Sequence, residues 1–310
     1  MKVSAILSIH NRGRLLKRAL WSYLWQTMPP KDFEIILVDD MSTCDLSSYY
    51  YDAVAGNLNF RHLTLNHTAH PIFKQRNPGW KPGDPEDWYH TPALSINAGI
   101  ALARGEVICL CHPEIIHSPQ SFDVGYDIAH THKLFAFSPC ALGTSETNEA
   151  IDALWDYRKL GWKGFKGAVQ YKALQKWGPT ELYWYSSFLP REACLKVRGV
   201  DFAYLNGVAG EDDDFRDRVV LSGTPANWIP DLESVHQDHS DETESVHRRD
   251  TQRWREALIV NRSLYYGRRN SQKYPQPANQ NYDWTARECW VREIGYVHGS
   301  TKAACLRYFK

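Results

Sequence analysis

Residues 33–43 read FEIILVDDMST, an apolar run that ends abruptly in two aspartates, Asp39 and Asp40. A similar run, residues 3–9 (VSAILSI), lies upstream of it. Between the two runs, residues 14–27 place leucine, alanine and tyrosine side chains at helical spacing. A buried strand, an amphipathic helix and a second buried strand in succession are typical of a βαβ unit. The stretch therefore predicts an α/β fold with a parallel sheet.

The same alternation continues toward residue 140. Strands are expected over 58–65 and 106–111, and a helix over 93–103. Residues 66–92 hold five prolines and two glycines in 27 residues, which predicts a long loop. The other expected elements are helices over 146–160, 211–221 and 251–266 and a strand over 183–189.

The composition is that of a globular protein. The chain has 310 residues, of which 43% are hydrophobic and 23% are charged, so it is long enough to bury a large core. The 36 basic and 36 acidic residues balance, which argues against a general nucleic-acid binder but leaves room for a local basic patch. No run approaches the roughly 18–20 apolar residues of a membrane span, and no signal-peptide cleavage site follows the first strand. The seven scattered cysteines lack Cys-x-x-Cys spacing, so we expect a reducing, cytoplasmic location.

Polar residues follow three of the predicted strands, at residues 8–11, 39–40 and 112–117. Ligands of parallel sheets bind at the carboxyl ends of the strands, so we expect a shared site there, although an acidic pair after a strand also fits a turn or a helix cap. The chain has neither a Gly-x-Gly-x-x-Gly motif nor a Gly-Lys-Ser/Thr loop. A nucleotide would therefore need a divalent cation or basic side chains for its phosphates.

Several motifs, in the expected order, resemble known enzymes. Residues 3–12, 15–27 and 32–43 closely resemble the opening of the family 2 glycosyltransferases, and residues 97–106 resemble the helix that leads into that family's metal site. Residues 210–218 (GEDDDFRDR) are similar to the acidic motif of the β-1,4-galactosyltransferases and the polypeptide N-acetylgalactosaminyltransferases.

This resemblance implies a GT-A fold, a Rossmann-like three-layer α/β/α sandwich with a mainly parallel sheet. Residues 1–240 would form the glycosyltransferase domain, with nucleotide-sugar binding in 1–120 and acceptor binding and the catalytic base in 121–240. Residues 241–310 would form a helical C-terminal extension. The implied donor is a UDP-sugar, and the residues placed to bind it are Ser8, His10, Asp40, Asn97 and His112. Asp40 would accept a hydrogen bond from the uracil ring, while Asp39 supports the turn.

The family's Asp-x-Asp metal motif falls on His112-Pro113-Glu114. The resemblance implies that Glu114 ligates Mn²⁺ or Mg²⁺, with His117 as a second candidate. The third implied ligand is His236, 25 residues beyond Glu211, with His239 as an alternative metal or phosphate contact. A mixed carboxylate and imidazole set suits Mn²⁺ better than Ca²⁺.

The acidic motif implies the chemistry. Asp212 occupies the position of the general base in inverting relatives, and Glu211 would orient the acceptor. The competing interpretation is that these acids only charge a helix N-terminus. A retaining glycosyltransferase, a nucleotidyltransferase and a non-catalytic sugar-nucleotide-binding protein are the alternative functions.

The neutral total hides two segments of opposite charge. Residues 201–245 hold 12 acidic residues and 2 arginines, and residues 247–273 hold 8 basic and 2 acidic residues. The basic segment is expected to fold back on the acidic one. The alternative is contact with an anionic acceptor or a membrane surface. The acceptor itself would be a glycan or another hydroxyl-bearing molecule.

Overall fold

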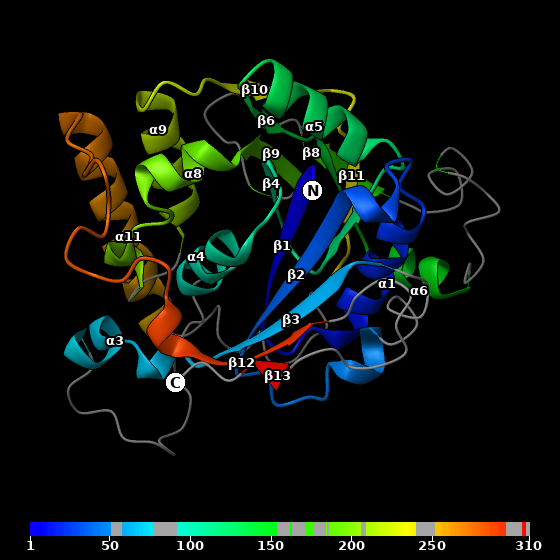
Figure 1. The fold of residues 1–310 in the computed structure, drawn as a ribbon, viewed down its shortest axis with the longest axis horizontal. Coiled ribbons are helices and arrows are strands. Elements are labelled where there is room, and N and C mark those ends of the chain that lie inside the picture. The colour runs from blue at the N-terminus through cyan, green and yellow to red at the C-terminus, as the bar shows by residue number, and fades with distance from the viewer. Residues whose placement is uncertain are drawn as a thin grey trace.

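The structure is a computed structural model. It describes residues 1–50, 58–76, 92–153, 162, 171–175, 184, 186–205, 209–239, 252–295 and 306–307. Nine of the described strands form one sheet in the order β10-β6-β9-β4-β1-β2-β3-β12-β13 (Figure 1). These strands are β1 (Val3–Ile9), β2 (Phe33–Asp40), β3 (Phe60–Leu65), β4 (Val107–Cys111), β6 (Phe135–Phe137), β9 (Ser186–Pro190), β10 (Ala226–Trp228), β12 (Trp290–Gly295) and β13 (Leu306–Arg307).

The centre of this sheet is parallel. β1 lies between β2 and β4, with Val3 opposite Phe33 on one side and Val107 on the other. Among the described strands, β9 and β12 run against the rest, because each pairs antiparallel with both of its neighbours. The expected α/β fold with a mainly parallel sheet is confirmed.

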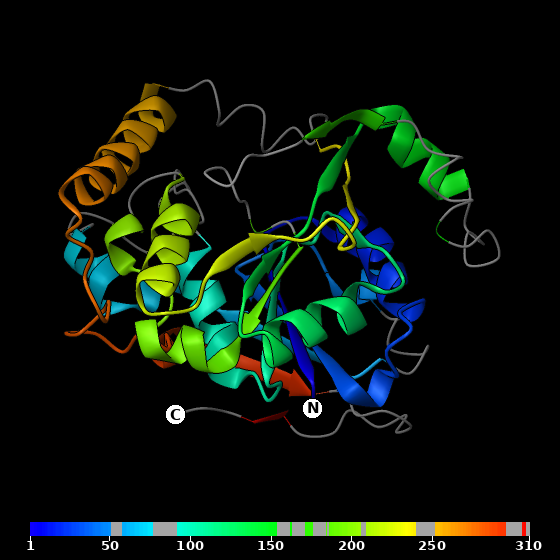
Figure 2. The same cartoon turned by 90° about the horizontal axis from the view of Figure 1, so that it is seen from above.

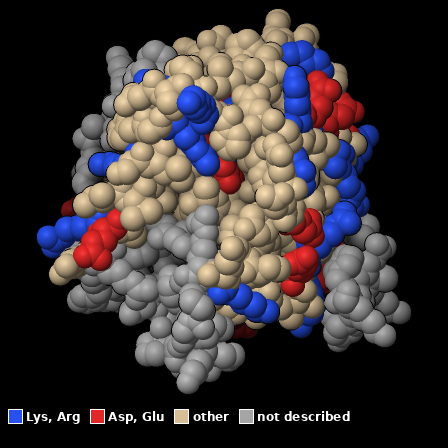
Figure 3. Space-filling model, turned by 90° about the vertical axis from the view of Figure 1, so that its left-hand side faces the viewer, with Lys and Arg blue, Asp and Glu red and all other residues tan. Residues whose placement is uncertain are grey.

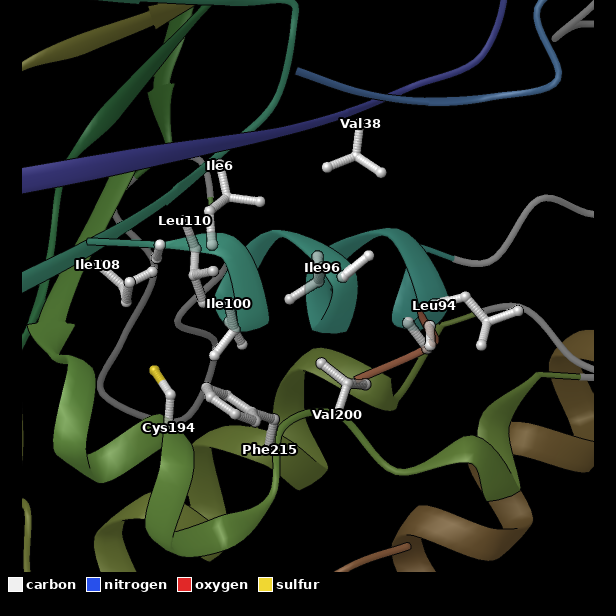
Figure 4. Packing of buried hydrophobic residues seen from close by; sticks show 14 of the residues in the cluster. Ile6, Val38, Leu94, Ile96, Ile100, Ile108, Leu110, Cys194, Val200 and Phe215 are labelled. Atoms are coloured by element: carbon white, nitrogen blue, oxygen red, sulfur yellow. The ribbon is translucent and has the colours of Figure 1, made fainter. Parts of the chain in front are cut away.

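Helices cover both faces of the sheet because the central strands are apolar on both sides. Val3, Ala5 and Leu7 of β1 belong to a cluster with residues of α1 (Gly13–Leu24) and α5 (Ser121–Thr131). Ile6, which points to the opposite face, belongs to a second cluster that includes residues of α4 (Ala93–Leu102), α8 (Arg191–Val197) and α9 (Glu211–Leu221). Figure 4 shows α4 between the sheet and α8 and α9. This is the three-layer sandwich that the resemblance implied.

A second, smaller sheet was not expected. Its order is β5-β11-β7-β8, with β5 pairing antiparallel to β11. The strands are β5 (Ile115–His117), β7 (Cys140–Gly143), β8 (Tyr171–Gln175) and β11 (Ser234–His236). The strands are short, so their sequences carry little periodic signal. This sheet begins directly after the polar residues that follow β4.

The predicted loop at 66–92 is partly wrong. A 3₁₀ turn, η2 (His67–Ala69), and a short helix, α3 (Pro71–Arg76), form inside it. Proline at the first helical position lacks only an N–H that would be unpaired there, so Pro71 starts this helix rather than preventing it. Residues 77–91 lie outside the described residues.

The other predicted helices are present over their described parts. α9 spans the predicted residues, α6 (Ser145–Ala153) begins where expected, and residues 154–160 of that prediction lie outside the described residues. The described residues also contain three further 3₁₀ turns: η1 (Pro30–Asp32), η4 (Phe202–Tyr204) and η5 (Arg287–Cys289). No helix in the described part of the chain is both long and apolar enough to cross a bilayer.

The C-terminal extension is helical over α11 (Gln252–Ser271), as expected. It also adds β12 and β13 to the main sheet beside β3, which the sequence did not predict. In Figures 1 and 2, α11 lies along α9 at one side of the molecule.

The basic segment folds back on the acidic one. The guanidinium of Arg268 on α11 donates to Asp214 over 2.7 Å and pairs with Asp201 over 2.9 Å. Figure 3 shows the side of the molecule where α11 lies, with basic and acidic side chains next to one another. These contacts confirm the expected fold-back between the oppositely charged segments.

Candidate active site

Three potential metal ligands meet beyond the carboxyl end of β4. Oε1 of Glu114 lies 3.7 Å from Nε2 of His236 and 3.9 Å from Nε2 of His239. The three potential ligand atoms all lie within 4.8 Å of one another, and Glu114 is buried. One cation could therefore reach all three side chains.

Pairing between β5 and β11 creates this cluster. His236 lies opposite Ile115, the residue after Glu114, and the backbone N–H of Gln237 donates to the carbonyl of Glu114 over 2.9 Å. His239 follows three residues after the strand and returns to the same carboxylate. The second sheet thus brings His236 and His239 next to Glu114, which lies more than 100 residues earlier in the chain.

The electrostatics keep Glu114 ionised. Burial alone would raise its pKa, but the positive charge of Arg12 and the nearby imidazoles of His112 and His236 hold the pKa well below the usual range. Arg12 Nη1 donates to Glu114 Oε1 over 2.9 Å. Burial also lowers the pKa of His236, with Glu114 opposing that shift, so a neutral imidazole is available at neutral pH.

The donor set fits a divalent transition-metal ion. Oε2 of Glu114 is buried and has no hydrogen-bond partner among the described residues, which is costly for a carboxylate oxygen unless another ligand engages it. One carboxylate and two imidazoles suit Mn²⁺, and the neutral state of His236 leaves its lone pair for coordination. Glu114 and His236 therefore lie together as the resemblance implied, with His239 as the third member.

His117 does not join this cluster, which corrects its expected role as a metal ligand. Its Nδ1 hydrogen-bonds with Ser186 Oγ and its Nε2 with Tyr23 Oη, each over 3.1 Å. The side chain is fully buried, and its ring packs edge-on against Phe122. Both ring nitrogens form hydrogen bonds inside the core. Side chains alternate between the two faces along β5, and that of His117 points toward α1 and α5.

Asn97 also differs from its expected role in donor binding. Its side-chain amide donates to the carbonyl of Val200 over 2.9 Å, and its Oδ1 accepts from the N–H of Val200 over 2.8 Å. A Cβ on Gly199, whose φ is +68°, would lie 2.1 Å from Asn97 Oδ1. Both polar groups of the fully buried Asn97 side chain are therefore engaged at the turn after α8.

The ends of β1 and β2 are joined by polar contacts. Nδ1 of His10 hydrogen-bonds with the carbonyl oxygen of Asp40 over 2.7 Å. The Asp40 carboxylate pairs with His67 Nδ1 over 2.9 Å, and Ser8 is half-buried near the end of β1. Asp39 accepts from the backbone N–H of Ser42 over 2.9 Å, which is the turn-supporting role expected of it. These hydrogen bonds fix the polar edge of the sheet at the ends of β1 and β2. The contacts of Ser8, His10, Asp40 and His112 with a nucleotide stay predictions.

Glu211 and Asp212 begin α9, after Gly210, which has a φ of +87°. Burial raises the pKa of Glu211 to about 7, with the neighbouring Asp213 adding to the shift. Burial, followed by the charges of Glu211 and Asp213, raises the pKa of Asp212 well above its usual range. No hydrogen bond or ion pair within the described part of the chain joins Glu211 or Asp212 to Glu114. These acids form a second group of perturbed carboxylates, which is typical of catalytic sites.

Comparison with known proteins rests on the structure. No family model matches the sequence, and neither does any curated protein. Among solved structures, residues 1–349 of S. aureus TarS in complex with UDP-GlcNAc align with a TM-score of 0.51 and 15% identity, covering 79% of this chain and 61% of that one. The mannosyltransferase PcManGT from Pyrobaculum calidifontis, in complex with GDP-Man and Mn²⁺, aligns with a TM-score of 0.54 and 13% identity, covering 89% of this chain and 66% of that one.

The fold is a GT-A-like glycosyltransferase fold. The chain spans 38% of another, longer TarS structure, with a TM-score of 0.50. At this level of identity the likeness establishes the fold.

Sequence reasoning missed Arg12 as a site residue. In the sequence it is one residue of the motif after the first strand, and in the structure its guanidinium reaches Glu114. The available signal was its place directly after the polar residues at the end of β1, where a basic side chain meets any anion bound at that edge.

Proposed function

We propose that this chain is a metal-dependent, inverting glycosyltransferase that transfers a sugar from a UDP-sugar to an acceptor hydroxyl. The observation that carries the proposal is the cluster of Glu114, His236 and His239 at the strand ends of a GT-A-like sheet. Solved structures with this fold contain UDP, UDP-GlcNAc, or GDP-Man with Mn²⁺. Residues 1–120 would supply most of the donor site, and 121–240 the acceptor site.

The donor half depends on charge. A cation held by Glu114, His236 and His239 would neutralise the charge that develops on the departing diphosphate. Glu114 stays ionised because Arg12 and the nearby imidazoles lower its pKa. His10 and Asp40 at the ends of β1 and β2 would bind the nucleoside, and His112 would contact the donor beside the cation.

The acceptor half depends on the start of α9. In the proposed step, the acceptor oxygen forms a bond to the anomeric carbon from the side opposite the diphosphate. The bond from that carbon to the diphosphate oxygen breaks, and its electron pair leaves with the diphosphate. The Asp212 carboxylate takes the acceptor's proton, and Glu211 holds the hydroxyl. Burial raises the pKa of Asp212, which makes its ionised form a stronger base.

The cysteines fit the expected reducing compartment. Cys109, Cys111, Cys140, Cys194 and Cys289 are free buried thiols, and no disulfide is present within the described residues. Burial raises the pKa of Cys194 and Cys289, which keeps these thiols protonated and unreactive. A cytoplasmic enzyme is therefore proposed.

A donor panel tests the function. The full chain is incubated with UDP-sugars and, for comparison, GDP-mannose, with Mn²⁺ or with EDTA, and release of nucleoside diphosphate is measured. We expect release of UDP from at least one donor, with Mn²⁺ only. NMR of a transferred sugar would then show inversion. Retention would favour the retaining alternative, and neither release nor nucleotide binding would favour a protein outside this class.

A further inference from the structure

Arg12 contacts the buried carboxylate of the proposed site, that of Glu114. It lies between β1 and α1, and its Nη1 donates to Oε1 of Glu114 over 2.9 Å. The Arg12 side chain is 24% exposed, whereas that of Glu114 is 9% exposed. The guanidinium therefore reaches from the accessible edge of the site into its buried carboxylate.

The contact uses the oxygen that a cation would need. Oε1 of Glu114, which accepts from Arg12, is also the atom nearest to His236 and His239. Arg12 supplies the largest of the stabilising charges around this carboxylate, ahead of the imidazoles. Without a positive partner, a buried carboxylate is strongly disfavoured. Arg12 thus does for Glu114 what a divalent cation would otherwise do.

Once a cation has bound Glu114, the surroundings of Arg12 favour the binding of an anion there. Arg12 is the N-cap residue of α1, whose first turn contains no acidic side chain and no side-chain cap. The amide groups and the dipole at this helix end carry partial positive charge. A guanidinium pairs with phosphate oxygens in a planar, two-pronged geometry.

We propose that Arg12 is a two-position residue. It neutralises Glu114 before the cation binds, and it holds the diphosphate of the nucleotide after the cation has taken over that carboxylate. The inference rests on the proposed function of the Glu114 cluster. It couples cation binding to nucleotide binding at Arg12: the cation displaces the guanidinium from Glu114, and the displaced guanidinium is then free to hold the diphosphate.

This double role predicts opposite effects of one substitution. Arg12→Met keeps most of the side-chain length but removes the charge, so Mn²⁺ would no longer compete with a guanidinium for Glu114. We expect Mn²⁺ alone to bind about 3–10-fold more tightly, and UDP in saturating Mn²⁺ to bind about 10–100-fold more weakly, the range for one charged hydrogen bond. Arg12→Lys keeps a charge without the planar fork and should fall between the two.

The chain offers a matched control. Arg14 lies two residues further along the same helix and is exposed. Arg14→Met removes the same charge from the same helix end without touching Glu114, so both affinities should stay within about twofold of the wild type.

The two affinities are measured separately on the full chain. Electron paramagnetic resonance of free Mn²⁺ gives the metal affinity without nucleotide, and calorimetry gives the UDP affinity in saturating Mn²⁺. Thermal melting confirms that each variant is folded, and Arg12→Lys carries the test if Arg12→Met is not. Equal or weaker Mn²⁺ binding by the Arg12 variants, or their unchanged UDP binding, overturns the two-position role. A wild-type chain that binds neither Mn²⁺ nor UDP overturns the proposed function as well, which separates the two failures.

Discussion

Nε2 of His236 lies 3.7 Å from Oε1 of Glu114; His236 ends β11, and Glu114 directly precedes β5, the strand that pairs antiparallel with β11. The ladder places His236 opposite Ile115, and the N–H of Gln237 donates to the carbonyl of Glu114, so strand pairing sets the backbone positions of both residues. Sites built on paired strands hold their geometry well. A rigid pair of this kind is suited to bind a cation with little reorganisation.

Replacing Glu114 should remove the cation. Glu114→Gln keeps the shape of the side chain but loses the one carboxylate of the cluster, so we expect Mn²⁺ affinity to fall at least about 100-fold. Glu256→Gln, on the exposed face of α11, is the matched control and should bind Mn²⁺ as the wild type does. Calorimetry with Mn²⁺ alone measures both. Unchanged binding by Glu114→Gln would place the cation elsewhere.

Asp212 should matter for turnover and not for nucleotide binding. Asp212→Asn removes the proposed base, so kcat should fall about 10²–10⁴-fold while the Kd for UDP stays within about twofold. Asp213→Asn is the neighbouring control. Its carboxylate pairs with Arg216 over 2.7 Å, so we expect most of the turnover to remain. Steady-state kinetics and UDP titration report the two effects, and wild-type kcat in Asp212→Asn would remove it from the mechanism.

Stability should fall as the pH rises through the titration of Glu211. Its pKa in the folded chain is raised from 4.5 to about 7, so the folded state holds this proton more tightly than the unfolded state. The resulting contribution to the free energy of unfolding is complete below about pH 4.5 and is lost as the pH passes 7. Glu211→Gln lacks this loss, so between pH 4.5 and 8 it should gain about 2–3 kcal/mol relative to the wild type.

Urea unfolding of both proteins in metal-free buffer at pH 4.5, 6 and 8 measures this difference. Parallel pH profiles for the wild type and Glu211→Gln would mean that the fold does not disfavour the Glu211 carboxylate.

The ion pairs of Arg268 on α11 with Asp201 and Asp214 should contribute to stability. Arg268→Gln leaves Asp201 and Asp214 without one cationic partner, although Arg218 still pairs with Asp214 over 2.7 Å. We therefore expect a loss of about 2–4 kcal/mol in the free energy of unfolding, which is toward the lower end of the range for breaking a buried ion pair. Arg269→Gln, on an exposed neighbour, should cost less than about 0.5 kcal/mol. Equal losses for the two variants in denaturant melts would argue against a stabilising role of the Arg268 ion pairs.

The sheet was predictable where the sequence is strongly patterned. β1, β2 and β4 are apolar on both faces because helices cover both sides, and such continuous runs stand out without any tertiary information. α3 was not predicted because the prolines in and after it indicate a loop. β5, β7 and β11 are too short to show a period, so the second sheet could not be foreseen.

The site was predictable only in part, for a related reason. The resemblance to glycosyltransferases implied Glu114 and His236, but choosing between His117 and His239 requires knowing which way each side chain faces. His117 faces Tyr23 in the core, and His239 faces Glu114. That choice depends on strand pairing between distant segments. The pairing of Arg12 with Glu114 has the same origin, since no local pattern marks a partner so far along the chain.

Anomalous diffraction at the manganese edge, from crystals of the full chain soaked with Mn²⁺ and UDP, tests the central claim most directly. The account predicts one strong peak about 2.2 Å from a carboxylate oxygen of Glu114, Nε2 of His236 and an imidazole nitrogen of His239, with the UDP diphosphate beside it. UDP bound without a peak at these three residues, or a peak held by other side chains, would contradict it.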